Sequence, residues 1–185
     1  MKKGFTLAEL LITMSLVAVI SLIISNVFIS GYRTFNDEIS NARIQANSQT
    51  ILDKIITETK NGMLIEASHN GFTTGTNTII IQVPAINHDK QIQYSGTSML
   101  FDRIIYFYAD SKIHRIVYAD PSSTRYNTNG IDKILSTNVL ELSFSYDPSA
   151  ETATLVTATV RTGDRVNGKT KQITLTGKAR LRNHI

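Results

Sequence analysis

Met1-Lys2-Lys3-Gly4-Phe5-Thr6-Leu7-Ala8-Glu9-Leu10 opens the chain, and no charged residue follows Glu9 until Arg33. A helix over residues 5–30 would be about 39 Å long, which is enough to cross a hydrocarbon core of about 30 Å with some tilt. Glu9 is the only charge within this segment. A carboxylate at that depth costs several kcal/mol unless a cation pairs with it, so Glu9 is a candidate functional residue.

The run from Lys2 to Ile12 resembles the class III signal of the type IV pilin superfamily, which comprises type IV pilins, minor pilins, competence pilins and type II secretion pseudopilins. The resemblance implies that a prepilin peptidase cleaves after Gly4 and methylates the new amino terminus at Phe5. It also implies that Glu9 is an assembly residue. In the family's filaments this carboxylate pairs with the terminal amine of an adjacent subunit.

Two other kinds of N-terminal segment compete with this interpretation. A secretory signal peptide has an apolar core of about 7–15 residues and a small-residue cleavage site; the run here is longer and lacks such a site around residues 20–32. An uncleaved signal anchor explains the length and a cytoplasmic Lys2-Lys3 flank. It does not explain Glu9 or the Gly4-Phe5 junction, whereas the pilin-like interpretation explains all of these features.

Composition favours one modest domain attached to an extended helix. The 185 residues are 42% hydrophobic and 18% charged, which suits a globular protein. Without cysteine, the chain forms no disulfide, iron–sulfur cluster or thiolate zinc site. That also excludes the disulfide-bounded loop of many Gram-negative pilins, and it is compatible with a Gram-positive envelope.

The helix is predicted to continue beyond the apolar run, because residues 33–60 are polar and contain no proline. One helical face carries Phe35, Ile39, Ala42 and Ala46, and we assign it to helix–helix contact or to the neck. A second face, about 100° away, carries Leu52, Ile55 and Ile56, and we expect it to pack on a sheet. A bend near Asn47-Ser48 that brings both faces to one core is an alternative. Asn61-Gly62 is expected to end the helix, with the glycine in the left-handed conformation.

Beyond Gly62, short β-like runs alternate with Gly, Asn, Asp, Pro and Ser. Asp110-Ser111 is predicted to be the turn between two of these strands, and Gly163–Gly168 the turn between the last two. In the last strand apolar and polar residues alternate, which indicates half-burial. The predicted strands are 78–83, 91–94, 99–101, 103–108, 112–118, 140–146, 155–161 and 173–181. The sequence therefore predicts an α+β fold, with a long N-terminal helix (the pilin stalk) packed on an antiparallel β-sheet domain.

Positive charge is concentrated at the C-terminal end of a chain whose net charge is +4. Residues 161–185 carry seven basic side chains against Asp164, a balance of +6, so the other 160 residues carry −2. The set would suit an anionic partner such as nucleic acid or a teichoic polymer. We favour a solvated basic strand pair, because no aromatic residue interleaves with the charges as single-strand binding requires. The residues are Arg161, Arg165, Lys169, Lys171, Lys178, Arg180 and Arg182.

Other kinds of site have weaker support. No phosphate-binding loop, nucleophile elbow, dinucleotide fingerprint or metalloprotease motif is present, so the sequence predicts no enzyme, cofactor or metal centre. The four histidines lack metal-ligand spacing, and each is predicted to be a surface residue. The loop 120–132 faintly resembles a calcium loop, but its low acidic density favours an ordinary solvent-facing turn. Within it, Tyr126 either contacts a partner or folds back on the sheet edge.

The predicted organisation is a leader over 1–4, a transmembrane and assembly helix over 5–32, an amphipathic continuation over 33–61 and a β-rich domain over 62–185. The resemblance implies a minor pilin or pseudopilin, held in the cytoplasmic membrane by a single pass with its N-terminus inside and then carried into an extracellular or periplasmic filament. Its expected partners are prepilin peptidase and other pilin or pseudopilin subunits. The ending 178–183 also resembles the minor-pilin W and pseudopilin J types. The alternatives are an adhesion or DNA-binding subunit at the tip of a competence-type pilus and a single-pass protein of unrelated function.

Overall fold

The computed structural model describes residues 6–166 and 169–182. The chain divides into two compact units, Met1–Ala42 and Arg43–Ile185. A single helix, α1 (Leu7–Lys60), contributes to both. The fold class is α+β, with one long N-terminal helix and antiparallel sheets, as the sequence predicts.

In the first unit, the stretch of α1 from Leu10 to Tyr32 carries no charged side chain. The large hydrophobic side chains of α1 from Leu7 to Ile29 are about half to four-fifths exposed. Three hydroxyls in this stretch bond back to the helix itself: Thr13 donates to the Leu10 carbonyl at 2.9 Å, Ser15 to the Ile12 carbonyl at 2.8 Å and Ser21 to the Val17 carbonyl at 2.8 Å. Because these polar groups are satisfied within the helix, they do not need water. The helix is long and apolar enough to cross a membrane.

In the second unit, the helical residues 43–60 bury one stripe of side chains. The face with Leu52 and Ile55 is buried, which confirms the prediction for that face. The helix continues without interruption through Asn47-Ser48. Ser48 is itself fully buried, and its hydroxyl bonds to the Ile44 carbonyl and to Thr162 Oγ1. The complete buried stripe is Ile44, Ser48, Ile51, Leu52, Ile55 and Thr59.

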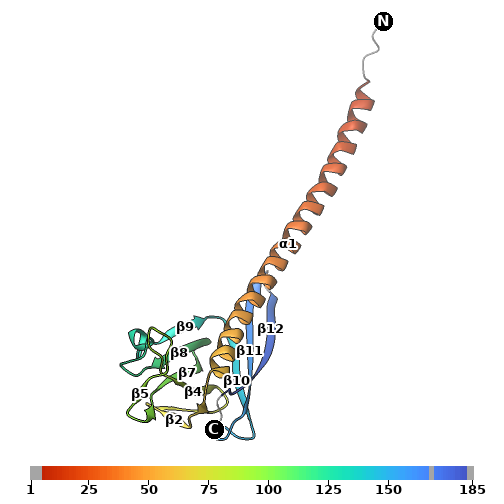
Figure 1. Ribbon diagram of the computed structural model, residues 1–185. Coiled ribbons are helices and arrows are strands. Elements are labelled where there is room, and N and C mark those ends of the chain that lie inside the picture. The colour runs from red at the N-terminus through yellow and green to blue at the C-terminus, as the bar shows by residue number, and fades with distance from the viewer. Residues whose placement is uncertain (1–5, 167–168, 183–185) are drawn as a thin grey trace. The chain divides into compact units, whose positions relative to one another are not determined.

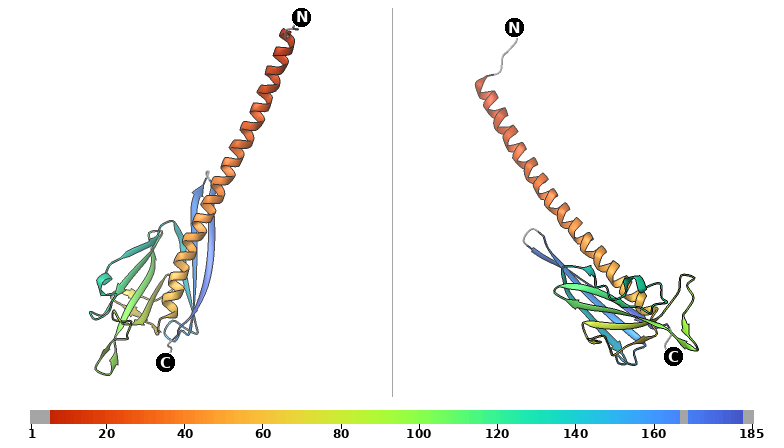
Figure 2. Two further views of the ribbon diagram at one scale, coloured as in Figure 1. Left: turned by 45° about the horizontal axis from the view of Figure 1, so that its top comes forward. Right: turned by 90° about the vertical axis from the view of Figure 1, so that its left-hand side faces the viewer.

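The strands form two main sheets and two small hairpins, not one continuous sheet as the sequence suggested. Figures 1 and 2 show the two main sheets from several sides. The larger sheet has the order β1-β4-β7-β8-β9 and the smaller one β10-β11-β12, with all neighbours antiparallel. Their bounds are β1 Leu64–Ile65, β4 Thr78–Pro84, β7 Phe101–Ala109, β8 Lys112–Tyr118, β9 Lys133–Ser136, β10 Val139–Asp147, β11 Leu155–Val166 and β12 Lys169–Arg180. The hairpins pair β2 (Ser68–His69) with β3 (Phe72–Thr73) and β5 (Tyr94–Ser95) with β6 (Ser98–Met99), and η1 is a short 3-10 helix, Tyr126–Thr128.

The helical residues 43–60 contact both main sheets, so one core serves all three layers. In Figure 1 the labels β7 and β8 lie on one side of this segment and β11 and β12 on the other. Ile55 belongs to a single cluster with Ile79, Ile104, Leu142 and Val160, which come from both sheets. Separation into two sheets therefore lets one buried stripe of this segment contact side chains from both sheets.

A polar cluster ties the helix to the larger sheet. The Arg115 guanidinium donates to both oxygens of Glu58, at 3.0 and 2.9 Å, and the Tyr106 hydroxyl donates to the same carboxylate at 2.5 Å. Burial, together with the Glu58 charge, raises the pKa of Tyr106 far above its usual range. Burial alone would lower the pKa of Arg115, but the hydrogen bond and charge of Glu58 outweigh it and raise that pKa. Tyr106 therefore stays protonated and Arg115 charged.

Two turns test the sequence predictions for the β-region. Asp110 and Ser111 join β7 to β8 with φ values of 50° and 59°, which confirms the predicted hairpin. The prediction of a turn starting at Gly163 was wrong. Gly163 lies within β11 and pairs with Gln172 on β12. The strands continue to Val166 and Lys169, and residues 167–168 lie outside those described.

The last strand is half-buried, as its alternating pattern predicts. Ala179 is fully buried and Lys178 and Arg180 are exposed. Gly177 lies on the inward side, where a Cβ atom would come within 2.9 Å of the Ile56 side chain. The absence of a side chain at residue 177 therefore allows β12 to approach α1 closely.

Gly62 ends α1 by a different mechanism from the one predicted. It has no positive φ, so the expected left-handed cap is wrong. Instead its amide bonds to the Thr59 carbonyl at 2.9 Å, and Asn61 donates to the Thr57 carbonyl at 3.2 Å. A Cβ atom on Gly62 would lie 2.6 Å from Ile81 Cγ2. Glycine is needed here because the chain passes directly against β4.

We therefore expect Gly62→Ala to destabilise the second unit by about 1–3 kcal/mol, because the added methyl group overpacks the contact with Ile81. Gly75→Ala is the matched control, since a Cβ there meets nothing within 4 Å and φ is not positive; it should change stability by less than about 1 kcal/mol. Urea unfolding of the full chain, followed by circular dichroism in nonionic detergent, measures both. Equal stability of the two variants would contradict the packing explanation.

Candidate functional site: the N-terminal carboxylate and the basic strands

Glu9 and Thr6 form a reciprocal cap at the start of α1. Glu9 Oε2 accepts hydrogen bonds from the Thr6 backbone amide and from the Thr6 hydroxyl, each at 2.9 Å. The Thr6 hydroxyl oxygen in turn accepts the Glu9 amide at 3.3 Å. This is the capping-box pattern, in which a threonine and a glutamate three residues later satisfy otherwise unpaired helical donors.

The cap leaves one carboxylate oxygen available. Both bonds from Thr6 end on Oε2, and Oε1 accepts no hydrogen bond from the described residues. An ionised carboxylate has about four acceptor positions. Thr6 therefore fixes the side chain of Glu9 at the head of the helix, and Oε1 remains free for an external cation. The Thr-x-x-Glu spacing already signals this cap in the sequence, although the sequence prediction for Glu9 did not include it.

The predicted processing residues, Gly4 and Phe5, lie outside the described residues. Residues 1–25 match the family model for the prokaryotic N-terminal methylation motif. The chain carries a prepilin-type signal. With the long apolar helix, this signal fits a type IV pilin-like protein and confirms the resemblance found in the sequence.

The prepilin-type signal indicates a structural, pilin-like protein. It implies processing by prepilin peptidase and assembly with other pilins, and with the apolar helix it is consistent with a membrane-anchored protein. No curated protein and no solved structure matches the chain significantly.

The seven basic residues of the C-terminal set do not occupy one continuous surface. Arg161 is bound to Glu141 on the neighbouring strand at 3.0 Å, and Lys171 stands opposite Asp164 in the β11–β12 register. Arg161 is opposite Thr174, four residues from Lys178, which is about 13 Å along the strand. Exposed side chains are found at Arg165, Lys178, Arg180 and Arg182; the side chain of Lys169 lies outside the described part.

Hydroxyl groups separate the basic residues on the outward face of the smaller sheet. Thr157 and Thr159 on β11 face Lys178 and Thr176 on β12, and the two threonine hydroxyls of 159 and 176 are 3.1 Å apart. Ser143 and Ser145 continue these rows on β10. The charge of this face is therefore divided between the two ends of the strands.

The loop 120–132 uses its oxygen atoms for protein contacts. Asn129 Oδ1 accepts the Ala119 amide at 2.9 Å, and the Asp132 carboxylate bonds to His114 Nδ1 at 2.8 Å. Within residues 6–166 and 169–182, no group of three or more His, Cys, Asp or Glu side chains is arranged to hold a metal ion. Tyr126 is 45% exposed in this loop.

A buried carboxylate organises the same loop, and reasoning from the sequence missed it. Asp102 is fully buried and accepts the Asp120 amide at 2.9 Å, the Ser123 hydroxyl at 2.6 Å and the Arg125 guanidinium at 2.7 Å. The signal was available, because Asp102 precedes Ile104 by two residues and must share its buried face of the strand. These bonds fasten the loop to the larger sheet.

His114 corrects the prediction that every histidine lies on the surface. It is 9% exposed, and its ring stacks on Phe107 with centroids 4.7 Å apart. Nδ1 bonds to Asp132, while Nε2 is buried without a partner among the described residues. The position of His114 within a strand, opposite Phe107 in the β7–β8 register, explains its burial.

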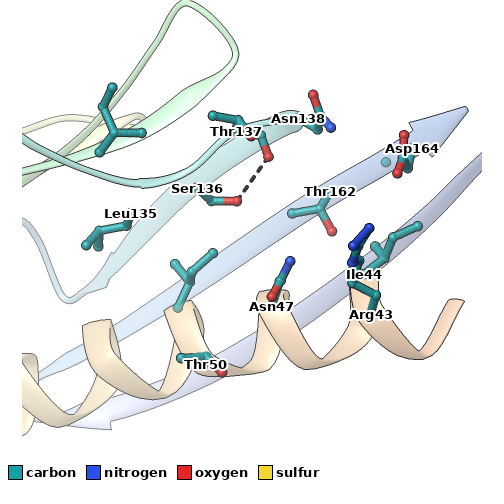
Figure 3. A pocket seen from close by; sticks show the side chains of 13 residues that line it. Arg43, Ile44, Asn47, Thr50, Leu135, Ser136, Thr137, Asn138, Thr162 and Asp164 are labelled. Carbon is teal, nitrogen blue, oxygen red and sulfur yellow. Dashed lines mark hydrogen bonds between the residues drawn. The ribbon is translucent and has the colours of Figure 1, made fainter. Parts of the chain in front are cut away.

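A pocket of about 480 Å³ lies between α1, β11 and the segment that joins β9 to β10 (Figure 3). Arg43 and Asn47 enter it from the helix, Asp164 from β11, and Ser136 and Asn138 from the opposite side. Ser136 donates to the Thr137 carbonyl at 3.0 Å. The described lining residues include neither histidine nor cysteine, and Asp164 is the one carboxylate among them.

The capping box predicts a specific effect of Thr6. Thr6→Val keeps the shape of the side chain but removes its hydroxyl, so the first turn of α1 should lose about 1 kcal/mol. Amide hydrogen exchange of residues 7–10, measured by NMR on the full chain in nonionic micelles, should accelerate about fivefold. Thr6→Ser retains the hydroxyl and should exchange like the original chain. Unchanged exchange in Thr6→Val would show that the cap does not hold this turn.

Proposed function

We propose that the chain is a structural subunit of a type IV pilus or pseudopilus, a minor pilin or pseudopilin that joins a filament through its N-terminal helix. The observation that carries this proposal is the prepilin-type signal placed directly before a capped carboxylate and an uncharged apolar helix. The helix first lies in the cytoplasmic membrane, with its N-terminus inside. After cleavage behind Gly4 by prepilin peptidase, Phe5 carries the methylated amine.

The exposed apolar surface of the helix is the surface that packs against neighbouring helices, through van der Waals contacts. Side chains from Leu7 to Ile29 have no cover within the first unit. Lipid covers them in the membrane, and neighbouring helices cover them in a filament. Apolar contacts of this kind are non-directional, so by themselves they leave the helices free to slide.

Glu9 fixes the axial position of one helix relative to its neighbour. Its free Oε1 accepts the ammonium group at the processed terminus of an adjacent subunit, while Thr6 holds the side chain in place. Two unpaired charges among apolar helices are costly, and pairing them removes both costs at once. A helix displaced by one turn loses this partner, so the ion pair selects one axial position.

The surface around Gly31 supports close helix contact. A notch of about 420 Å³, almost wholly apolar, is lined by Val27, Phe28, Gly31, Tyr32 and Phe35. A Cβ atom on Gly31 would meet nothing within 4 Å inside the chain. Small residues let helix backbones approach each other closely, which suits the predicted helix–helix face that continues through Phe35 and Ile39.

The family resemblance is the support for a proposed position in the filament. A low-abundance subunit near the initiating tip would use its sheets to contact neighbours or ligands, and retention of Glu9 argues against the terminal tip type, which lacks that acid. A second candidate function is a tip-located adhesion or DNA-binding receptor of a competence-type pilus. The exposed basic residues near the C-terminus favour it.

Replacement of Glu9 tests the assembly role. Glu9→Ala and Glu9→Val should be processed normally but enter purified filaments about tenfold less than the original chain, because the neighbour's amine then has no partner. Glu38→Ala is the control, since it removes an exposed carboxylate from the same helix outside the apolar run. Quantitative immunoblots of sheared filaments measure incorporation. Incorporation of Glu9→Ala equal to that of the original chain would contradict this assembly role.

The processing prediction separates a pilin-like subunit from an ordinary single-pass protein. Mass spectrometry of the chain from its native cells should find a mature terminus at methylated Phe5. Gly4→Leu should leave the leader attached, because a bulky residue replaces the glycine before the cleaved bond. Recovery of the original chain with an intact Met1 would contradict the processing step.

A further inference from the structure

A concave basic surface lies where α1 ends beside the last strand, and we call it the C-terminal basic pocket. It has a volume of about 750 Å³. Lys60 and Asn61 come from the end of the helix, and Arg180 and Arg182 come from the end of β12 and the residues after it. The remaining lining residues are Thr57, Thr154 and Leu181.

The lining is unusual in its charge. Three of its seven residues are cations and no carboxylate is among them. All three cations are exposed, and none forms an ion pair with the described residues. By contrast, Arg161 and Arg115 are matched by Glu141 and Glu58. Like charges converge here, and no carboxylate of residues 6–166 or 169–182 pairs with them, which raises the local positive potential.

We propose that the C-terminal basic pocket binds the phosphodiester backbone of an anionic polymer. The two guanidinium groups offer planar, paired donors that match phosphate oxygens, and Lys60 adds a point charge. The Asn61 amide and the hydroxyls of Thr57 and Thr154 add neutral donors. None of the seven described lining residues is aromatic, so the pocket recognises backbone charge and not stacked bases.

The pocket includes only part of the basic set found in the sequence. Only Arg180 and Arg182 of the seven C-terminal residues line it, and the third cation, Lys60, is distant in the sequence. Folding brings Lys60 to them because α1 packs on the inward side of β12, where Gly177 leaves room for Ile56. The site is therefore a property of the fold and does not depend on assembly into a filament.

A cation near the last turn of a helix also compensates the partial negative charge of that terminus. That role is limited here, because the Thr57 and Thr59 carbonyls already accept the amides of Asn61 and Gly62. If the cations only compensated the helix terminus, their replacement would change the stability of the protein and not its binding of a ligand. If they bind phosphate, their replacement weakens ligand binding.

The test uses the purified full chain in nonionic detergent and three probes: a duplex DNA, poly(glycerol phosphate) and polyglutamate of similar length. The pocket variant is Lys60→Gln/Arg180→Gln/Arg182→Gln. The matched control, Lys90→Gln/Lys112→Gln/Lys133→Gln, removes the same charge from positions outside the pocket and outside the C-terminal basic set. Fluorescence anisotropy at several salt concentrations gives Kd and its salt dependence, and circular dichroism verifies folding.

For the original chain we expect binding to one or both phosphodiester polymers, and the probe that binds identifies the source of the phosphate. The pocket variant should bind about tenfold or more weakly, and for DNA the salt slope should fall by about 2.7 if three phosphate contacts are lost. The control should change Kd by less than about threefold. An Arg180→Lys/Arg182→Lys variant should be intermediate, because it keeps the charge but loses the forked donors.

Three results would overturn the proposal. One is no binding of either phosphodiester polymer by the original chain. Another is an equal loss in the pocket and control variants, which would indicate net charge alone. The third is equally tight binding of polyglutamate, which would remove the preference for phosphate.

Discussion

The second unit depends on the burial of one helical segment between two sheets. Residues 43–60 place Leu52 and Ile55 in a cluster that also contains side chains from β4, β7, β10 and β11. Apolar burial is strong but non-directional, so it fixes the layers without fixing the helix along its axis. The polar contacts supply that direction. Glu58 is held by Arg115 and Tyr106 on the larger sheet, and Ser48 by Thr162 on the smaller one. Two polar anchors about ten residues apart on opposite sheets thus define both the rotation and the axial position of α1.

The N-terminal end of α1 also combines an apolar surface with one polar contact. From Leu7 to Ile29 the apolar surface can slide against any other apolar surface, and only a polar group can specify one arrangement. Glu9 is suited to that task because Thr6 occupies one of its oxygens and leaves the other accessible. A free carboxylate would sample many rotamers, whereas a capped one presents an oriented acceptor. The capping box therefore prepares the residue for an external cation before any partner arrives.

Much of this arrangement could be predicted from the sequence, because the decisive signals are local. The helix, the buried face with Leu52, the Asp110-Ser111 turn and the alternation before Leu181 follow from periods of 3.6 and 2 and from turn chemistry. The misses involve residues whose role depends on distant partners. There is no room for a side chain at Gly62 because Ile81 of β4 lies against it. Gly163 lies in a strand because Gln172 pairs with it. Likewise, no local pattern joins Lys60 to Arg180, whereas Asp102 and the capping box had local signals that were not used.

Charge at the edge of the smaller sheet is consistent with assembly through the helix. In the order β10-β11-β12 the last strand pairs on one side only, so its other edge presents unpaired backbone groups. Such an edge invites pairing with a second sheet, and basic side chains along it oppose that pairing. Lys178 and Arg180 stand exposed on β12, where a second copy would bring like charges together. For a subunit concentrated in a membrane or a filament, this repulsion disfavours edge-to-edge aggregation and leaves the helix as the assembling surface. Arg180, which also lines the C-terminal basic pocket, has no ion-pair partner in the described part of the chain, and this leaves it available to an anionic polymer.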